Sequence, residues 1–386
     1  MYFDNAATSF PKPAAVIEAM TGFMARGGGN PGRSGHGKSV EAGMEVFRAR
    51  EALASLMGVK NPMRVVFGHN ATDALNLAIQ GLAREGGHAV TTSMEHNSVI
   101  RPLRELEKRG LISLTVVPCS PEGAADPDAI ARAITAGTCL VAANHASNVS
   151  GIVQPIGEIG AACRARGVPF IVDASQSAGI VPIDMARDGI DLLAVTGHKA
   201  LYGPTGTGAL IIADSFDYSL LRPLRYGGTG SRSDSIEHPD FLPDRFEAGT
   251  LNTVGIAGLL AGIEYLMASG GPKRAGEHKR ALTGRFVDAA RGSVPGFRPV
   301  HPELSQTGVV SFTIDGFSPS EVGEYLDERC VQSRVGLHCA PLAHQTLGTF
   351  PAGTVRFSFG MFNTLDEIDE AAGMLADLAA GPARPR

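Results

Sequence analysis

The chain has 386 residues, of which 44% are hydrophobic, and 34 lysines and arginines against 39 aspartates and glutamates give a formal net charge of −5. This length and apolar content favour two domains, or one large domain with an appendage. The acidic balance offers no basic face to nucleic acid or to an anionic membrane, so we expect small molecules or proteins as partners.

The cysteines and the hydropathy pattern indicate the compartment. No Cys-x-x-Cys pair occurs, which argues against a metal site or a disulfide framework and fits a reducing cytosol. Residues 1–5 show no signal-peptide pattern, and the longest weakly apolar stretch, residues 254–263, is too short to span a bilayer. We therefore expect a cytoplasmic protein without a membrane segment or a bound metal.

The N-terminal region predicts an arm followed by two helices. Residues 4–8, with Pro11 and Pro13 after them, favour a short extended arm, and helical spacing follows at 14–24 and 41–57. Between the helices, a glycine-rich segment carries Asn30, Arg33 and His36. This segment is either a ligand-facing loop or a plain linker.

From residue 64 onward, short apolar runs alternate with helical segments. The expected strands are 64–67, 89–92, 111–117, 139–143, 170–172, 192–195 and 209–212, and the expected helices are 74–83, 99–108, 127–135 and 156–166. This alternation predicts an α/β fold in which a mostly parallel sheet is covered by helices on both faces. Ligands of such sheets bind at the carboxyl ends of the strands.

The pattern changes in the last third of the chain. Residues 225–252 are polar and loop-like, a helix is expected at 256–267, and a second alternation follows with strands at 309–314, 331–335 and 355–359 and helices at 320–328 and 366–378. We predict a large domain over residues 15–255, a small C-terminal α/β domain made of residues 1–14 and 256–380, and a disordered tail at 381–386.

A lysine follows the apolar run that ends at Val195, in the sequence Thr196-Gly197-His198-Lys199, and a glycine-rich turn leads on to the next strand. A lysine among small and hydroxyl-bearing residues suits a Schiff base with a carbonyl cofactor such as pyridoxal phosphate. The alternative is a surface loop with a solvated lysine.

Polar side chains that suit the same cofactor follow other strands. Ala71 and Thr72 lie at the start of an expected helix, where free amides and a hydroxyl can bind a phosphate; the alternative is an ordinary helix N-cap. His96 suits stacking on a ring and Asn148 suits donation to a phenolate oxygen, with a surface histidine and a turn asparagine as alternatives. Asp173 ends the most apolar strand, where its carboxylate needs a partner such as a protonated pyridine nitrogen or a helix amide.

Motifs in order along the chain resemble the class V aminotransferase superfamily, and more narrowly its cysteine desulfurase and selenocysteine lyase branch. They are Asp4-Asn5-Ala6-Ala7-Thr8, Glu95-His96-Asn97, Ser147-Asn148-Val149-Ser150-Gly151, Asp173-Ala174-Ser175-Gln176, Gly197-His198-Lys199, Gly203-Pro204-Thr205-Gly206 and Ala248-Gly249-Thr250-Leu251-Asn252. The resemblance implies the fold type I of transferases that depend on pyridoxal 5′-phosphate (PLP). It also implies Lys199 as the Schiff-base lysine, Asp173 on the pyridine nitrogen and His96 stacked on the ring.

The same resemblance extends the cofactor site. Asn148 and Gln176 would contact the phenolate side of PLP, and Thr250 would reach the phosphate of the neighbouring subunit's cofactor, which implies a homodimer. The residues expected around the phosphate within one subunit are Ala71, Thr72, Thr196 and His198.

The second half of the site is expected near the C-terminus. Cys339 lies in a glycine-flanked loop beside His338 and shortly after Arg334, surroundings that can make a thiol nucleophilic, although such a cysteine can also be incidental. In the family this loop carries the persulfide-forming cysteine, and Arg356 matches the arginine that binds the substrate α-carboxylate. The candidate substrate contacts are Arg356, Arg334, Asn30 and His36.

The resemblance implies a PLP-dependent cysteine desulfurase, similar to the second desulfurase group, that converts L-cysteine to L-alanine and passes sulfur from Cys339 to an acceptor protein. Lys199 would remove the α-proton and His96 would move protons. The alternatives are a lyase acting on L-selenocysteine, a class V transaminase or epimerase in which Cys339 is incidental, and a non-catalytic scaffold, against which Lys199 and Asp173 speak. Residues 30–36 and 227–233 depart from the pattern of both desulfurase groups.

Overall fold

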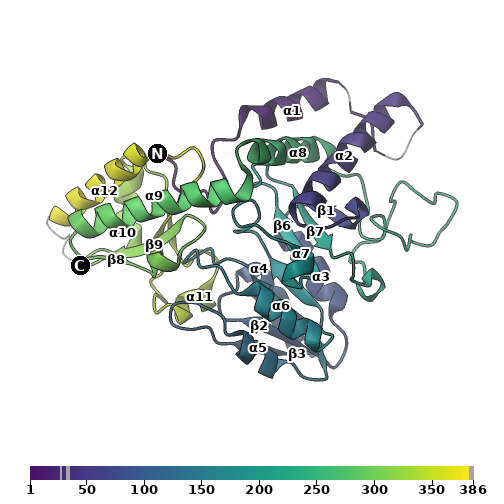
Figure 1. The fold of residues 1–386 in the computed structure, drawn as a ribbon, viewed down its shortest axis with the longest axis horizontal. Helices are drawn as coiled ribbons and strands as arrows, with labels where there is room; N and C mark the ends of the chain where they lie inside the picture. The colour runs from purple at the N-terminus through teal and green to yellow at the C-terminus, as the bar shows by residue number, and fades with distance from the viewer. Residues whose placement is uncertain (27, 32–34, 382–386) are drawn as a thin grey trace.

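The computed structural model describes residues 1–26, 28–31 and 35–381 of the chain. Arg33 and residues 382–386 of the expected tail lie outside the described residues. Two sheets organise the described chain, one of seven strands and one of four, and the long helix α9 (Gly271–Ser293) runs beside the smaller one (Figure 1).

The large sheet has the order β1-β7-β6-β5-β4-β2-β3. β6, β5, β4, β2 and β3 run parallel, whereas β7 is antiparallel to β6 and β1 is antiparallel to β7. Every residue of β4 to β7 is buried, because helices cover both faces, and this explains the continuous apolar runs. The strands are β1 (Val65–Gly68), β2 (Gly87–Thr92), β3 (Ile112–Val117), β4 (Thr138–Asn144), β5 (Phe170–Asp173), β6 (Leu192–Thr196) and β7 (Gly208–Ile212).

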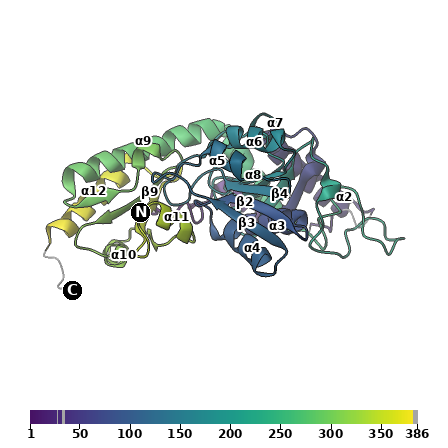
Figure 2. The same cartoon turned by 90° about the horizontal axis from the view of Figure 1, so that it is seen from below.

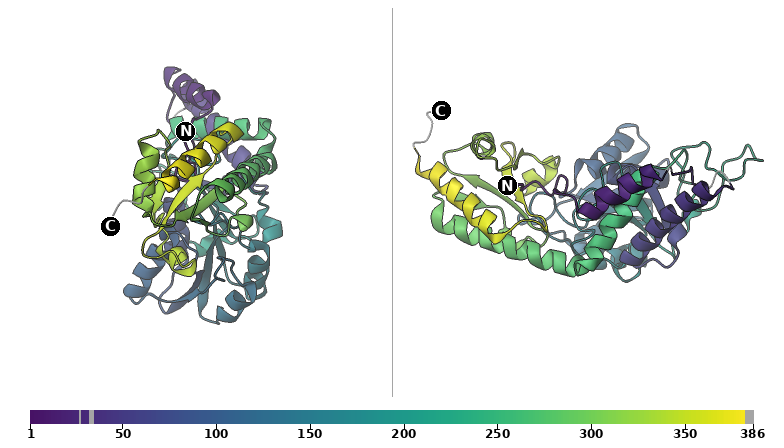
Figure 3. Two further views of the ribbon diagram at one scale, coloured as in Figure 1. Left: turned by 90° about the vertical axis from the view of Figure 1, so that its left-hand side faces the viewer. Right: turned by 90° about the horizontal axis from the view of Figure 1, so that it is seen from above.

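Helices lie on both sides of this sheet. α3 and α4 lie on one side, and α5, α6 and α7 lie on the other (Figure 2). The N-terminal helices α1 and α2 both pack on α8 (Figure 3). The bounds are α1 (Ala14–Ala25), α2 (Gly37–Leu56), α3 (Ala71–Leu82), α4 (Asn97–Lys108), α5 (Pro127–Ala133), α6 (Ile156–Ala165), α7 (Met185–Asp188) and α8 (Thr253–Ala268), with 3-10 turns η1 (Pro62–Arg64) and η2 (Tyr218–Leu220).

The small sheet is antiparallel, in the order β10-β11-β9-β8. Its core is aromatic and includes Phe286, Phe312, Phe357 and Phe359, and Phe3 of the N-terminal arm joins them with no exposed surface. The elements are β8 (Phe297–Pro299), η3 (Pro302–Leu304), β9 (Val309–Ile314), α10 (Pro319–Asp327), β10 (Arg334–Gly336), α11 (Pro341–Thr346), β11 (Thr354–Ser358) and α12 (Leu365–Ala380).

The structure differs from the sequence-based prediction in the small unit. The strand expected at 331–335 starts later than predicted, at Arg334, because Val331 is a buried residue after α10 and Gln332 bridges to Tyr2. The long helix α9 was not expected at all. The domain boundaries near residues 15 and 255 stay predictions.

Within the described ranges, no single helix is both long and apolar enough to cross a membrane, and only the pair α8 and α9, bent by 74°, passes that test jointly.

A buried ion pair ties α2 to the segment before α8. Arg50 Nη1 and Nη2 donate to Glu247 Oε1 at 2.8 Å and Oε2 at 2.6 Å, and Glu247 Oε1 also accepts from the Phe67 amide at 2.6 Å. The two side chains are only 5% and 6% exposed. A buried charge that loses its partner still bears its desolvation cost, so this pair holds both segments on β1.

Glu247→Gln is therefore expected to lower the free energy of unfolding by about 3 kcal/mol, because Arg50 loses its countercharge inside the protein. Equilibrium urea unfolding measures the loss. The control is Glu264→Gln, which breaks the exposed Arg48–Glu264 pair of 3.0 Å and is expected to change the same free energy by less than about 1 kcal/mol. Equal losses in the two variants would contradict the role of burial.

Candidate active site

A cavity of about 290 Å³ lies between the carboxyl ends of the parallel strands and the small sheet. It is also lined by Ala6 and Ala7 of the N-terminal arm, so segments from the whole chain meet there. The sequence-predicted residues that line it are Ala71, Thr72, His96, Asn148, Asp173, Gln176, Thr196, His198, Lys199, Arg334, Cys339 and Arg356.

Asn30, His36 and Thr250 do not line this cavity. His36 caps α2, since its Nδ1 accepts from the Ser39 amide at 3.3 Å, and the Asn30 carbonyl accepts from Ser39 Oγ at 2.7 Å. Thr250 is exposed in the segment before α8. Within one chain, the structure therefore does not bring these residues to the site, and their roles stay predictions.

One end of the cavity is suited to an oxyanion. α3 begins at Ala71, and the first amides of a helix have no acceptor within the helix. Among the described residues, Thr196 Oγ1 and His198 Nδ1 are buried without a hydrogen-bond partner. Burial and the nearby cation Lys199 lower the pKa of His198 to about 4, so its ring is neutral. A bound phosphate would satisfy these groups, so the residues fit this part of PLP.

Asp173 and His96 add a buried carboxylate and a neutral imidazole to the same cavity. Asp173, at the end of β5, accepts from the Ser175 amide at 2.9 Å and from the Ser175 hydroxyl through Oδ1, while Oδ2 has no hydrogen bond to a described residue. His96 caps α4, with Nδ1 accepting from the Ser98 amide at 3.1 Å. Burial lowers the pKa of His96 to about 4, and Lys199 contributes, although Asp173 opposes the shift. A cationic pyridine ring fits between such a carboxylate and an uncharged ring face.

Lys199 lies in the turn after β6. An added Cβ at Gly197 would overlap Thr207 Oγ1, so only glycine fits where this turn packs against β7. Burial lowers the pKa of Lys199 to about 8, with Arg356 and Arg334 contributing and Asp173 opposing. The amine therefore exchanges protons close to neutral pH, as a catalytic base requires.

Arg356 is an almost fully buried cation, 1% exposed, on β11. Its Nη2 donates to Asp4 Oδ1 at 2.6 Å, its Nη1 donates to the Asn148 carbonyl at 3.1 Å, and its Nε has no partner among the described residues. Arg334 lies directly opposite Arg356 on β10. Two arginines that face one cavity form a site for a carboxylate.

Cys339 sits in the short loop between β10 and α11. Arg334 Nη2 lies 3.5 Å from the Cys339 Sγ. The Cys339 carbonyl accepts from the Asn97 amide of α4 at 2.8 Å. His338 and Cys339 both adopt left-handed backbone conformations, with φ of 48° and 59°. Left-handed backbone conformations are uncommon for residues other than glycine, so surrounding contacts hold the thiol in this position.

His338 does not act on Cys339 as its position in the sequence suggested. Its Nε2 is 2.9 Å from Thr354 Oγ1, and burial, with the cations Arg356 and Arg334, lowers its pKa to about 2. The ring is neutral and bound to β11. Arg334 therefore provides the positive charge beside the thiol.

The sequence-based reading assigned no role to several residues of the site. Asp4 was noted only as part of a motif, yet it pairs with Arg356, which is 352 positions away. Ser98 joins Thr72 and His96 through hydrogen bonds of 2.7 and 2.9 Å. The signal for Ser98 was its place two residues after His96, and nothing local signalled the pairing of Asp4.

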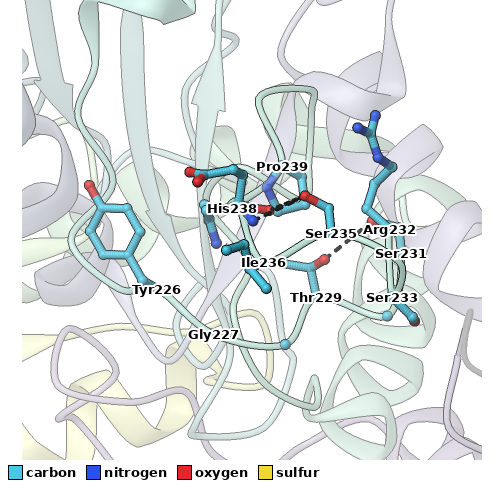
Figure 4. A pocket seen from close by; sticks show the side chains of 13 residues that line it. Tyr226, Gly227, Thr229, Ser231, Arg232, Ser233, Ser235, Ile236, His238 and Pro239 are labelled. Carbon is cyan, nitrogen blue, oxygen red and sulfur yellow. Dashed lines mark hydrogen bonds between the residues drawn. The ribbon is translucent and has the colours of Figure 1, made fainter.

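A larger cavity lies in the long loop before α8. It measures about 690 Å³ and is enclosed only by residues 226–239 of the long loop before α8 (Figure 4). The side chains drawn around it include serine and threonine hydroxyls and His238, and its lining contains no lysine or cysteine. We therefore assign the chemistry to the smaller cavity between the two sheets.

A family profile described as aminotransferase class-V matches residues 1–371. The chain belongs to the class-V aminotransferase family. The class-V relatives include the probable cysteine desulfurase of Pyrococcus abyssi, 34% identical over 98% of this chain and 94% of the relative, and that of Methanothermobacter thermautotrophicus, 35% identical with the same coverage.

Solved structures of class-V enzymes are similar throughout. The apo cysteine desulfurase from Thermococcus onnurineus superposes with a TM-score of 0.90 at 34% identity, covering 98% of this chain and 94% of that one. The cysteine desulfurase CsdA from Escherichia coli gives a TM-score of 0.87 at 28% identity, with the same coverage. The predicted family and α/β fold are confirmed.

The desolvation of Lys199 predicts a pH-dependent stability change. In cofactor-free protein, Lys199→Met is expected to raise the free energy of unfolding by about 3 kcal/mol below pH 8. The folded-state pKa of about 8 lies below the ordinary value of 10.5, so wild type gains stability as pH rises between them and the difference fades. Urea unfolding at pH 7 and pH 10 measures it.

The exposed lysine variant Lys273→Met is the control and is expected to show no such pH-dependent difference. A stability gain of Lys199→Met that stays constant from pH 7 to pH 10 would mean that packing, rather than desolvation of the amine, is responsible.

Proposed function

We propose that this class-V chain is a PLP-dependent cysteine desulfurase, which converts L-cysteine to L-alanine and leaves the sulfur on Cys339 as a persulfide. The observation that carries the proposal is the shared cavity of Lys199, Arg356 and Cys339, in which Arg334 Nη2 lies 3.5 Å from the thiol sulfur. The names of relatives that cover 98% of the chain support the same reaction.

The cofactor would be held by groups that have unused hydrogen-bonding capacity. The first amides of α3, with Thr72, Thr196 and His198, would hold the phosphate, and Asp173 would pair with the pyridine nitrogen. The Gln176 amide donates one N–H to the Ala6 carbonyl at 3.0 Å and keeps a second for the phenolate oxygen. Asn148 likewise uses one N–H on the His338 carbonyl, at 2.7 Å, and keeps one.

Bound PLP supplies an electron sink that makes the α-proton of an amino acid acidic. Lys199, neutral in part near pH 8, takes this proton, and Arg356 orients the substrate by its carboxylate. The Cys339 thiolate attacks the substrate sulfur, so that an S–S bond forms while the substrate C–S bond breaks. The electron pair of that bond stays with carbon, which is protonated to the methyl group of alanine.

The assembly we propose is a homodimer with shared sites. Thr250 is exposed in its own chain, which is the position required for a contact with a neighbouring subunit's cofactor. Exposed apolar side chains on the N-terminal helices, among them Ile17, Met24, Val40 and Met44, support a chain-to-chain interface there. Asn30 and His36 lie in the segment between these helices. We place the enzyme in the cytoplasm, because all five cysteines are free.

Cys339→Ala is expected to reduce alanine and sulfide release from L-cysteine by about 100-fold or more, because no thiolate is left to take the sulfur. The assay is single- and multiple-turnover alanine formation with a reducing thiol present. Cys330→Ala, at an exposed free cysteine outside the site, is expected to keep wild-type rates.

The same assay with L-selenocysteine separates the neighbouring activities. Alanine from selenocysteine but not from cysteine, with or without Cys339, would establish a selenocysteine lyase instead. Alanine from neither substrate would contradict both and favour a transaminase or epimerase.

Arg356→Lys is expected to raise the KM for L-cysteine about tenfold or more, since an ammonium group cannot bind a carboxylate through two parallel N–H bonds. The expected change in kcat is smaller. Arg298→Lys, at an exposed arginine paired with Asp315, is the matched control and should leave KM unchanged. An unchanged KM in Arg356→Lys would exclude Arg356 as the carboxylate ligand.

A further inference from the structure

Cys339 also lines a cavity that Lys199 does not line. This cavity measures about 480 Å³ and lies between α3 and α4. Thr72, His96, Ser98 and Cys339 line both it and the cavity of the proposed active site, so the thiol stands at the boundary between two chambers. Lys199 and Arg356 line only the first chamber, and Arg101 lines only the second.

The charges of the second chamber favour an anion. Arg101 is exposed and forms no ion pair with a described residue, and Arg334, which lines only the first chamber, lies 3.5 Å from the thiol sulfur at the boundary. Arg109 is paired with Glu105 at 2.8 Å, and these two charges offset one another. Arg101 and Arg334 both act electrostatically on His96, between the chambers, which indicates that their fields reach this boundary.

The walls of the second chamber also suit a small organic ligand. On the α3 side, Gln80 donates to Asn76 at 2.7 Å, which leaves further amide donors and acceptors on that wall. On the α4 side, Pro102 and the buried Leu106 add apolar surface. A volume of about 480 Å³ lies within the range of small-ligand sites.

We propose that this second chamber is the acceptor subsite, which takes a thiol that carries a negative charge close to its sulfur, with the anionic group at Arg101. The inference rests on the proposed desulfurase function. The acceptor thiolate attacks the outer sulfur of the Cys339 persulfide, a new S–S bond forms, and the bond to Cys339 Sγ breaks. Cys339 leaves as a thiolate, so charge and electrons balance without an added oxidant or reductant.

The test measures how well anionic and neutral thiols accept sulfur. Holoenzyme with saturating L-cysteine is given 2-mercaptoethanesulfonate or 2-mercaptoethanol, and kcat/KM for each thiol is taken from alanine release and divided by its thiolate fraction. At low ionic strength the wild-type ratio of anionic to neutral thiol is expected to be about 5 or more, falling as salt is added.

Substitution of Arg101 is expected to change that ratio. Arg101→Ala brings it to about 1, Arg101→Glu brings it below 1, and Arg101→Lys retains most of it, since charge rather than geometry carries the preference. The matched control is Arg104→Ala, on the same helix, where the arginine is paired with Glu107 at 2.6 Å and does not line the chamber. Its ratio should equal that of wild type.

A second arm distinguishes a free small thiol from a polypeptide acceptor. It compares the capped peptides Glu-Cys-Glu and Lys-Cys-Lys in the same assay. A preference for 2-mercaptoethanesulfonate that depends on Arg101 supports the inference with a small thiol as acceptor. A preference for Glu-Cys-Glu that depends on Arg101 supports it with a polypeptide as acceptor. Equal ratios in wild type, Arg101→Ala and Arg101→Glu, or a preference for the cationic peptide, would overturn it.

The proposed function has its own readout in these samples. Without any thiol, wild type is expected to release alanine in a single burst as Cys339 is converted to the persulfide. Absence of that burst from wild type would contradict the desulfurase proposal itself, whereas a burst followed by transfer that ignores charge would contradict only the acceptor subsite.

Discussion

The buried guanidinium of Arg356 joins the parts of the site. It reaches from the small sheet to Asp4 on the N-terminal arm and to the Asn148 carbonyl after β4, at 2.6 and 3.1 Å. Asn148 in turn donates to the carbonyl of His338, next to Cys339. A cation so deeply buried must keep these acceptors, because each lost bond would leave charge uncompensated. Arg356 is therefore one of the contacts that set the position of the thiol loop relative to the large sheet.

Burial sets the protonation states inside the cavity. It is the largest cause of the lowered pKa values of Lys199, His96, His198 and His338, and nearby arginines act in the same direction on three of them. The imidazoles are neutral as a result, and Lys199 titrates close to pH 8. A dianionic phosphate would meet free hydrogen-bonding groups of Thr196 and His198, and a substrate carboxylate would meet Arg356, one N–H group of which already binds Asp4.

The sequence was most informative where one local signal decides the structure. Strands β5 and β6 are buried on both faces, so each appears as a continuous apolar run that ends in a polar residue, which placed Asp173 at the end of β5 and Lys199 shortly after β6. It was least informative where distant segments pair. Asp4 with Arg356, and Tyr2 with Gln332, have no local signal, and the second of these pairings displaces the start of β10.

Two further limits of the sequence have separate causes. α9 begins Gly271-Pro272-Lys273-Arg274 and is strongly polar over most of its length, so its narrow apolar face, including Phe286, did not stand out. Thr250 was expected from family resemblance to touch the cofactor, and Asn30 and His36 were expected from their glycine-rich segment to face a ligand, yet one chain leaves all three outside the cavity. A contact between a residue of one subunit and the site of another is not visible in the structure of a single chain.

Helix α4 links the two sides of Cys339. Its cap is His96, which lines the cavity of Lys199, its first amide holds the Cys339 carbonyl at 2.8 Å, and Arg101, one turn further on, lines the second chamber. His338 and Cys339 adopt left-handed conformations, which are uncommon for residues other than glycine, and this hydrogen bond is one of the contacts that hold them. The thiol is thereby fixed relative to both chambers at once. In the proposed reaction, sulfur would be received from the cavity of Lys199 and released into the second chamber, both of which Cys339 lines.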